Sequence, residues 1–201
     1  WTYAELADET ARVASALGQR GVKPGQAVGI FMPMIPEIEA ALLGIARLGA
    51  IAVPLFSGFS PPAIVSRLND AGAVAVLTAD ASPRRGKPVW MEAALADALN
   101  DVPSVHTVIS VRRFGGAAAD PSRDLDWAET VGAASADFAA VPVAAEDTFL
   151  IAYTSGTTGR PKGVVHTHLG VQAKATSDFL LCLDMKQDDR HLWMTDMGWV
   201  M

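Results

Sequence analysis

The chain has 201 residues and a formal net charge of −6, from 16 basic and 22 acidic side chains. Half of its residues are apolar and 19% are charged, which fits a globular protein and excludes an intrinsically disordered one. The negative charge argues against a nucleic-acid binder, and no unbroken apolar stretch reaches the roughly 18 residues of a membrane span.

Hydrophobic periodicity predicts alternating helices and strands over the first part of the chain. The first helix opens with Thr2 and Glu5 at the spacing of a capping box, and later helices begin near Pro36 and Pro61. This alternation predicts an α/β fold, an open sheet layered with helices. In chain order the predicted elements are a helix at 2–19, a strand at 27–32, a helix at 36–48, a strand at 50–55, a helix from 60 onward, a strand at 73–78, a helix at 90–99 and a strand at 106–111.

The segment 115–145 is rich in alanine and shows little strand signal. We expect it to be an irregular surface segment with one short helix at 125–133, anchored to the core by Trp127 and Phe138. Cys182 is the one cysteine, so an intrachain disulfide is excluded, and we expect a buried thiol. The last predicted elements are a buried strand at 148–154, a helix at 169–183 and a strand at 192–195.

The segment 154–163 carries the strongest chemical signal in the chain. It reads TSGTTGRPKG, with four hydroxyl side chains and three glycines directly after a predicted buried strand. Glycines let backbone N–H groups approach an anion closely, hydroxyl groups add donors, and Lys162 adds a positive charge. These groups suit the β- and γ-phosphates of ATP.

Two other interpretations of this segment are a plain hairpin turn and the P-loop, a different phosphate-binding motif. A Gly-rich hairpin turn would use the glycines but has no need of four hydroxyl groups. The P-loop of kinases and ATPases places four residues between a glycine and a Gly-Lys-Ser/Thr triplet. Here Gly156 is followed by Gly159, and Lys162 by Gly163, so the spacing excludes a P-loop.

The segment 154–163 resembles the phosphate-binding signature of adenylate-forming enzymes: acyl-CoA synthetases, peptide-synthetase adenylation domains and luciferases. Other stretches resemble acetyl-CoA synthetase and its short-chain relatives, namely residues 56–61, 84–89, 166–167 and 193–200. The resemblance implies a two-step ligation. A short- or medium-chain carboxylate displaces pyrophosphate from ATP, with Mg²⁺ nearby, and the acyl group of acyl-AMP then passes to coenzyme A.

The resemblance also implies a role for each matching residue. Lys162 and Thr157 are expected to be catalytic, and Trp199 and Val200 to line the pocket for the acid. The residues expected to hold the ATP phosphates are Thr154, Ser155, Gly156, Thr157, Thr158, Gly159 and Lys162. The residues expected to meet coenzyme A are Phe56, Ser57, Arg84, Lys87 and Val89.

Plainer alternatives stand beside these roles. The basic stretch at 84–87 is alternatively a solvated turn, in which Arg85 is as good a candidate as Arg84, and Trp199 is alternatively a core residue. Asp196 is assigned only the shaping of a turn. Met201 stands where acetate-specific relatives tend to have a small polar residue, so the acid is left open.

The histidines give no metal site. His166 and His168 would share a face of a strand but have no third ligand nearby in the sequence. No residue of the chain is therefore assigned to a metal ion.

The resemblance implies that residues 1–201 form a partial N-terminal AMP-binding domain. The rest of that domain and a swinging C-terminal domain would lie downstream, so we expect the piece alone to be inactive and to expose apolar surface where it is cut. The expected partners are a small-molecule carboxylic acid, ATP and CoA in the cytoplasm, with no nucleic acid and no membrane span; the oligomeric state stays open. The alternatives are an adenylation domain that loads a carrier-protein thiol and a non-catalytic ATP-binding relative.

Overall fold

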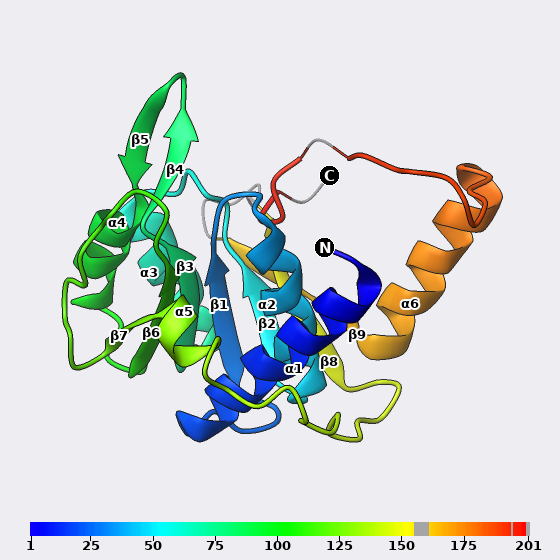
Figure 1. Cartoon of the computed structure of the whole chain (residues 1–201), viewed down its shortest axis with the longest axis horizontal. Coiled ribbons are helices and arrows are strands. Elements are labelled where there is room, and N and C mark those ends of the chain that lie inside the picture. The colour runs from blue at the N-terminus through cyan, green and yellow to red at the C-terminus, as the bar shows by residue number, and fades with distance from the viewer. Residues whose placement is uncertain (155–160, 194, 200–201) are drawn as a thin grey trace.

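Figure 1 shows the computed structural model of the chain, which describes residues 1–154, 161–193 and 195–199. A seven-stranded sheet forms its centre, in the order β7-β6-β3-β1-β2-β8-β9. All neighbouring strands pair in parallel except β8 and β9, which are antiparallel. The strands are β1 (Ala27–Phe31), β2 (Ile51–Pro54), β3 (Ala75–Ala79), β6 (Thr107–Val111), β7 (Asp124–Asp126), β8 (Thr148–Thr154) and β9 (Lys162–Thr167).

Helices cover both faces of the sheet, so two hydrophobic cores lie on opposite sides of it. The predicted α/β class is therefore confirmed. None of the helices in the described ranges has both the length and the apolar character needed to cross a bilayer. One face carries α1 (Tyr3–Gln19), α2 (Pro36–Arg47) and α5 (Trp127–Thr130), the other carries α3 (Pro61–Ala71) and α4 (Met91–Leu99), and α6 (His168–Ser177) with a π-helical turn (Asp178–Cys182) follows β9.

The predicted elements form for the expected local reasons. The Thr2 hydroxyl accepts a hydrogen bond from the Glu5 N–H at 3.2 Å, and the Thr2 N–H donates to the Glu5 carboxylate at 2.6 Å, which completes the capping box. The strands β1, β3 and β6 are buried along their whole length, as expected for parallel strands covered on both faces. Trp127 is buried and Phe138 packs on the same core, so both predicted anchors are confirmed.

Several predictions were wrong or incomplete. The stretch predicted as a strand at 192–195 forms no ladder in its described residues, and Leu192 is 82% exposed. The predicted helix at 169–183 divides into α6 and the π-helical turn, and Cys182 in that turn is exposed rather than buried. Large apolar side chains are exposed along β9, α6 and the residues after them: Val164, Val165, Leu169, Phe179, Leu180, Leu181, Leu183, Leu192 and Trp193.

Four strands are absent from the prediction: β4, β5, β7 and β9. β7 is rich in aspartate, a poor strand former, and pairs only at the sheet edge. The hairpin of β4 (Ala81–Arg84) and β5 (Lys87–Trp90) contains two prolines, which hide its strand character. β9 overlaps the end of the glycine-rich segment, and its two valines, Val164 and Val165, are too short an apolar run to indicate a strand.

The carboxyl ends of the parallel strands lie along one edge of the sheet. Residues 55–59 follow β2 there, the β4–β5 hairpin follows β3, and Thr154 ends β8 at the same edge. The hairpin stands at the top of Figure 1, and the chain after α6 returns to the same side. In open α/β sheets, ligands bind at this edge.

A buried aspartate fixes the base of the hairpin. Asp80 joins β3 to β4 and is fully buried. Its backbone carbonyl accepts hydrogen bonds from the N–H groups of Met91 and Glu92, which directly follow β5 at the base of the hairpin. Its carboxylate accepts from four backbone N–H groups at 2.7–3.1 Å, those of Ala81, Arg113, Phe114 and Gly116.

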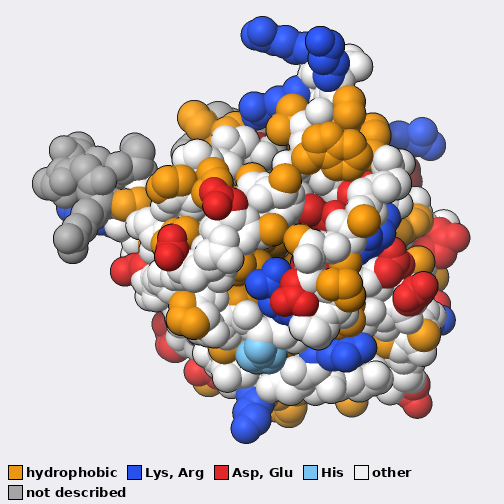
Figure 2. Space-filling model, turned by 90° about the vertical axis from the view of Figure 1, so that its left-hand side faces the viewer, with side chains coloured by type: hydrophobic (Ala, Val, Ile, Leu, Met, Phe, Trp, Pro, Cys, Tyr) orange, Lys and Arg blue, Asp and Glu red, His pale blue; other side chains and the backbone are white. Residues whose placement is uncertain are grey.

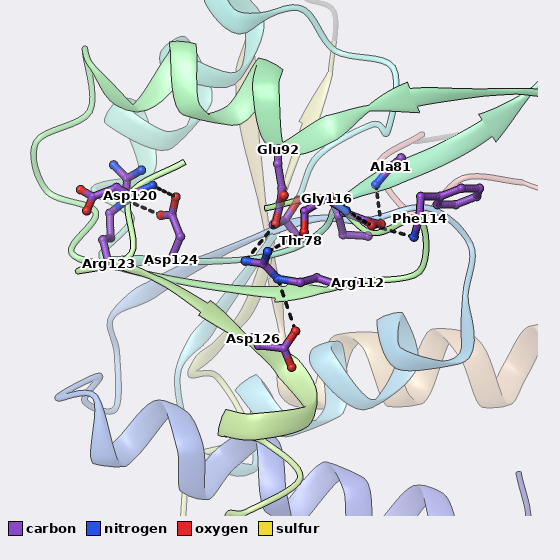
Figure 3. Close-up of polar contacts among 12 residues, drawn as sticks. Thr78, Ala81, Glu92, Arg112, Phe114, Gly116, Asp120, Arg123, Asp124 and Asp126 are labelled. Carbon is purple, nitrogen blue, oxygen red and sulfur yellow. Dashed lines mark hydrogen bonds and ion pairs between the residues drawn. The ribbon is translucent and has the colours of Figure 1, made fainter. Parts of the chain in front are cut away.

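The loop after β6 is held from its other side by Arg112. Figure 3 shows the N–H groups of Ala81 and Phe114 directed at one carboxylate, and Arg112 between Glu92 and Asp126. Arg112 donates to the Gly116 carbonyl at 2.7 Å and lies 3.3 Å from the Asp126 carboxylate and 3.7 Å from that of Glu92. Hairpin, loop and helix α4 are therefore held as one unit.

We predict that Asp80→Asn destabilises the complete protein by about 3 kcal/mol, because the amide cannot accept from the same set of backbone donors. Burial raises the pKa of Asp80, but hydrogen bonds from the Phe114, Arg113, Gly116 and Ala81 backbone outweigh it, so the pKa lies below its ordinary value. A lowered pKa contributes stability above the unfolded-state pKa of about 4, and that contribution is lost as pH falls. The difference between wild type and variant should therefore shrink below about pH 4.

Urea unfolding at pH 7 and at steps down to pH 3 measures this difference. Asp97→Asn, at an exposed position of α4, is the matched control and should change the free energy of unfolding by less than about 0.5 kcal/mol. A loss in Asp80→Asn no larger than in this control would show that Asp80 does not hold the hairpin.

Candidate functional site

The structure brings several of the predicted site residues to the carboxyl edge of the sheet. Phe56 and Ser57 follow β2, and Arg84 and Lys87 face each other across the tip of the β4–β5 hairpin. Trp199 reaches the same place from the far end of the chain, since its ring contacts Phe56. Segments separated by more than a hundred residues therefore meet here.

The hairpin presents basic side chains to solvent. Arg85 and Gly86 form its two-residue turn, both with positive φ, 49° and 76°, as in the mirror-image turns that suit the twist of paired strands. Arg84, Arg85 and Lys87 are exposed, and Figure 2 shows Lys and Arg side chains gathered at the top of the molecule. Val89, in β5, is also exposed, at 45%.

Phe56 lies between the basic hairpin and Trp199. The Arg84 guanidinium is 5.6 Å from the centre of the Phe56 ring, and the Trp199 ring meets Phe56 edge to face at 5.5 Å. The ring of Phe56 also contacts Phe59, at 5.6 Å. Of the two candidate arginines, Arg84 is thus the one that stacks on the aromatic group.

The Phe59 ring rests in turn on Arg67 of α3, whose guanidinium also lies near the ring of Tyr153 in β8. Arg67 is buried, and its guanidinium lies 4.1 Å from the centre of the Phe59 ring. The Tyr153 hydroxyl donates to Asp70 at 2.6 Å, and burial together with this acceptor raises the pKa of Tyr153. Arg67 therefore links the aromatic cluster to Tyr153.

Asp196 joins two of the predicted binding segments, a role that sequence reasoning missed. Its carboxylate accepts hydrogen bonds from the Ser57 hydroxyl at 2.6 Å, from the Ser57 N–H at 3.3 Å and from the Gly198 N–H at 2.9 Å. The sequence signal available for this role was an aspartate two residues before a glycine, in a turn rich in aromatic residues. Its distant partner, 139 positions away, could not be read from the sequence.

The phosphate-binding prediction is only partly within the described residues. Thr154 ends β8, half-buried, and Lys162 begins β9, exposed; the two face each other in the antiparallel ladder. The two ends of the glycine-rich segment are thus side by side at the carboxyl edge. The predicted residues Ser155, Gly156, Thr157, Thr158 and Gly159 lie outside the described residues, as does Val200.

The two histidines after the glycine-rich segment, His166 and His168, lie in different surroundings. His166 is exposed in β9 and lines an apolar hollow with residues of α6, and the ring of His168 contacts Phe149 at 5.3 Å. Within the described ranges, no group of three or more His, Cys, Asp or Glu side chains is placed to hold a metal ion.

Comparison with known proteins gives one consistent relationship. Acetyl-coenzyme A synthetase of Streptomyces coelicolor is 43% identical, and acetyl-coenzyme A synthetase 2 of Pseudomonas putida is 44% identical, each over 99% of this chain and 31% of the relative. The solved structure of acetoacetyl-CoA synthetase from Streptomyces lividans matches with a TM-score of 0.91 at 30% identity, over 98% of this chain and 30% of that protein.

The chain thus spans a little under a third of the length of these relatives. The family model for AMP-binding enzymes matches residues 1–201, the whole of the chain. The chain belongs to the AMP-binding enzyme family.

Proposed function

We propose that the complete protein is an AMP-forming acyl-CoA synthetase for a short- or medium-chain carboxylic acid, and that residues 1–201 are part of its N-terminal domain. One observation carries the proposal: Phe56 contacts both Arg84, expected at coenzyme A, and Trp199, expected at the acid. An enzyme that joins an acyl group to coenzyme A needs these two sites to be neighbours. The kinship with acetyl-coenzyme A synthetases supports the same reaction.

In the first step a carboxylate oxygen attacks the α-phosphorus of ATP, and the bond to the β-phosphate oxygen breaks. Acyl-AMP forms and pyrophosphate leaves. A carboxylate is already a nucleophile, so the main requirement is to neutralise the charge that grows on the pyrophosphate. We assign this to Thr154, Ser155, Gly156, Thr157, Thr158, Gly159 and Lys162, with Lys162 and Thr157 as the catalytic members.

Mg²⁺ would accompany the ATP phosphates and share in neutralising them. The described residues hold no cluster of acidic side chains that fits such an ion, so no ligand in this chain is assigned to it.

In the second step the thiol of coenzyme A loses its proton to solvent and its sulfur attacks the acyl carbon; the bond from that carbon to the phosphate oxygen breaks, and AMP leaves. We assign the phosphate end of coenzyme A to Arg84 and Lys87, because exposed cations attract a dianionic phosphate. Phe56, Ser57 and Val89 would meet its adenine, for which an apolar surface is suited. Both ATP and coenzyme A are cytosolic, so we place the reaction in the cytoplasm.

The acid would lie against Trp199 and Val200. A bulky indole at the end of a pocket shortens it and favours small acids. Trp199 is in contact with Phe56 and is not part of either hydrophobic core, which supports a pocket wall over a core residue.

The experiment that tests the proposed function is carboxylate-dependent exchange between ATP and pyrophosphate, measured on the complete protein with acids from acetate to octanoate and with branched and aromatic acids. We expect exchange with one class of chain length. Folded protein that binds ATP but supports no exchange with any acid would contradict the proposal and favour a non-catalytic relative.

We predict that Arg84→Glu combined with Lys87→Glu raises the KM for coenzyme A at least about tenfold, because two attractive charges become repulsive. Acid-dependent exchange, which uses no coenzyme A, should be unchanged. Arg20→Glu, an exposed charge after α1, is the matched control. An unaltered KM for coenzyme A would remove the assignment and favour a carrier-protein thiol as the acceptor.

We predict that Lys162→Ala lowers kcat/KM for acid-dependent exchange about a hundredfold, the usual cost of removing one donor to a developing negative charge. The control is Lys23→Ala, an exposed lysine in the turn before β1, at the opposite edge of the sheet. Turnover equal to wild type in Lys162→Ala would refute the catalytic role of this lysine.

A further inference from the structure

Hydrogen bonds connect the segment after β2, expected at coenzyme A, to the turn that carries Trp199, expected in the acid pocket. Both the hydroxyl and the N–H of Ser57 donate to one oxygen of Asp196, at 2.6 and 3.3 Å. The other oxygen of Asp196 accepts from the Gly198 N–H at 2.9 Å, and the Asp196 carbonyl accepts from the Trp199 N–H at the same distance. One carboxylate therefore fixes the Ser57 backbone and the turn at once.

The two segments also approach too closely for any side chain between them. A Cβ added to Gly198 would lie 2.1 Å from the Phe56 nitrogen and 2.2 Å from the Leu55 carbonyl carbon. Both of these are backbone atoms, which cannot move aside as the end of a side chain can. Glycine is thus required at this position, and the turn rests directly on the backbone after β2.

Little else in the described part of the chain sets the orientation of Trp199. Its side chain is 57% exposed, so burial in a core does not fix it. Its ring meets that of Phe56 at 5.5 Å, and Phe56 is supported by Phe59 and, through it, by the buried Arg67. The position of the indole therefore depends on the residues that follow β2.

We infer that Ser57 and Asp196 are positioning residues for acid selectivity, acting by holding Trp199 through the backbone contact at Gly198. The inference rests on the proposed function and deepens it. The segment after β2 then serves both substrates. One side of it faces coenzyme A, and through Asp196 it also positions Trp199, which limits the length of the acid. Selectivity for the acid should consequently respond to changes at Ser57 in a reaction that contains no coenzyme A.

The test is the acid preference of the complete protein in ATP–pyrophosphate exchange without coenzyme A. Preference is the ratio of kcat/KM for the best acid to that for the acid two methylene groups longer. We expect Ser57→Ala and Gly198→Ala each to lower this ratio at least about threefold, since a displaced wall discriminates methylene groups less well. Ser122→Ala should leave it unchanged. This control loses an equivalent bond, from the Ser122 hydroxyl to Asp120 at 2.6 Å, in a surface turn before β7.

The outcomes separate the inference from the function on which it rests. Absence of acid-dependent exchange in the wild type would overturn the proposed function. Wild-type preference in Trp199→Ala would overturn the assignment of the pocket wall, and the inference with it. A Ser57→Ala protein with wild-type preference and only a raised KM for coenzyme A would overturn the inference alone. Ser57→Ala decides the question by itself if Gly198→Ala does not fold.

Discussion

The common direction of the parallel strands is the constraint on which the rest of this structure depends. β1, β2, β3, β6 and β8 run the same way, so the segments that follow them must all emerge at one edge. That requirement gathers residues 55–59, the basic hairpin and the ends of the glycine-rich segment, although they are distant in the sequence. The burial of the central strands on both faces supplies the stability that holds this edge in place.

Two buried or partly buried carboxylates turn this general arrangement into a specific site. Asp80 gathers four backbone N–H groups beneath the hairpin, and Asp196 joins the segment after β2 to the turn with Trp199. Each uses its charge to satisfy backbone donors rather than to react. Phe56 connects the two regions, because its ring contacts Arg84 of the hairpin and Trp199 of the turn.

The sequence predicted the α/β class and most of the sheet because periodicity and caps are local signals, as the capping box of Thr2 and Glu5 illustrates. The hairpin at Arg84 was not predicted, because its prolines and charges are typical of a loop and its strands pair only with each other. The hydrogen bond between Ser57 and Asp196 was not predicted for another reason: it depends on how the sheet brings distant segments together. The expected strand at 192–195 failed because apolar composition alone does not supply a neighbouring strand.

A crystal structure of the complete protein with an unreactive acyl-adenylate analogue and coenzyme A tests the central claim most directly. The account predicts that both ligands lie at the carboxyl edge of the sheet, with the acyl chain against Trp199 and the 3′-phosphate of coenzyme A nearest to Arg84 and Lys87. Phe56 should then lie between the two ligands, with the Ser57–Asp196 bond intact. Ligands bound at another edge of the sheet, or coenzyme A placed away from the hairpin, would contradict it.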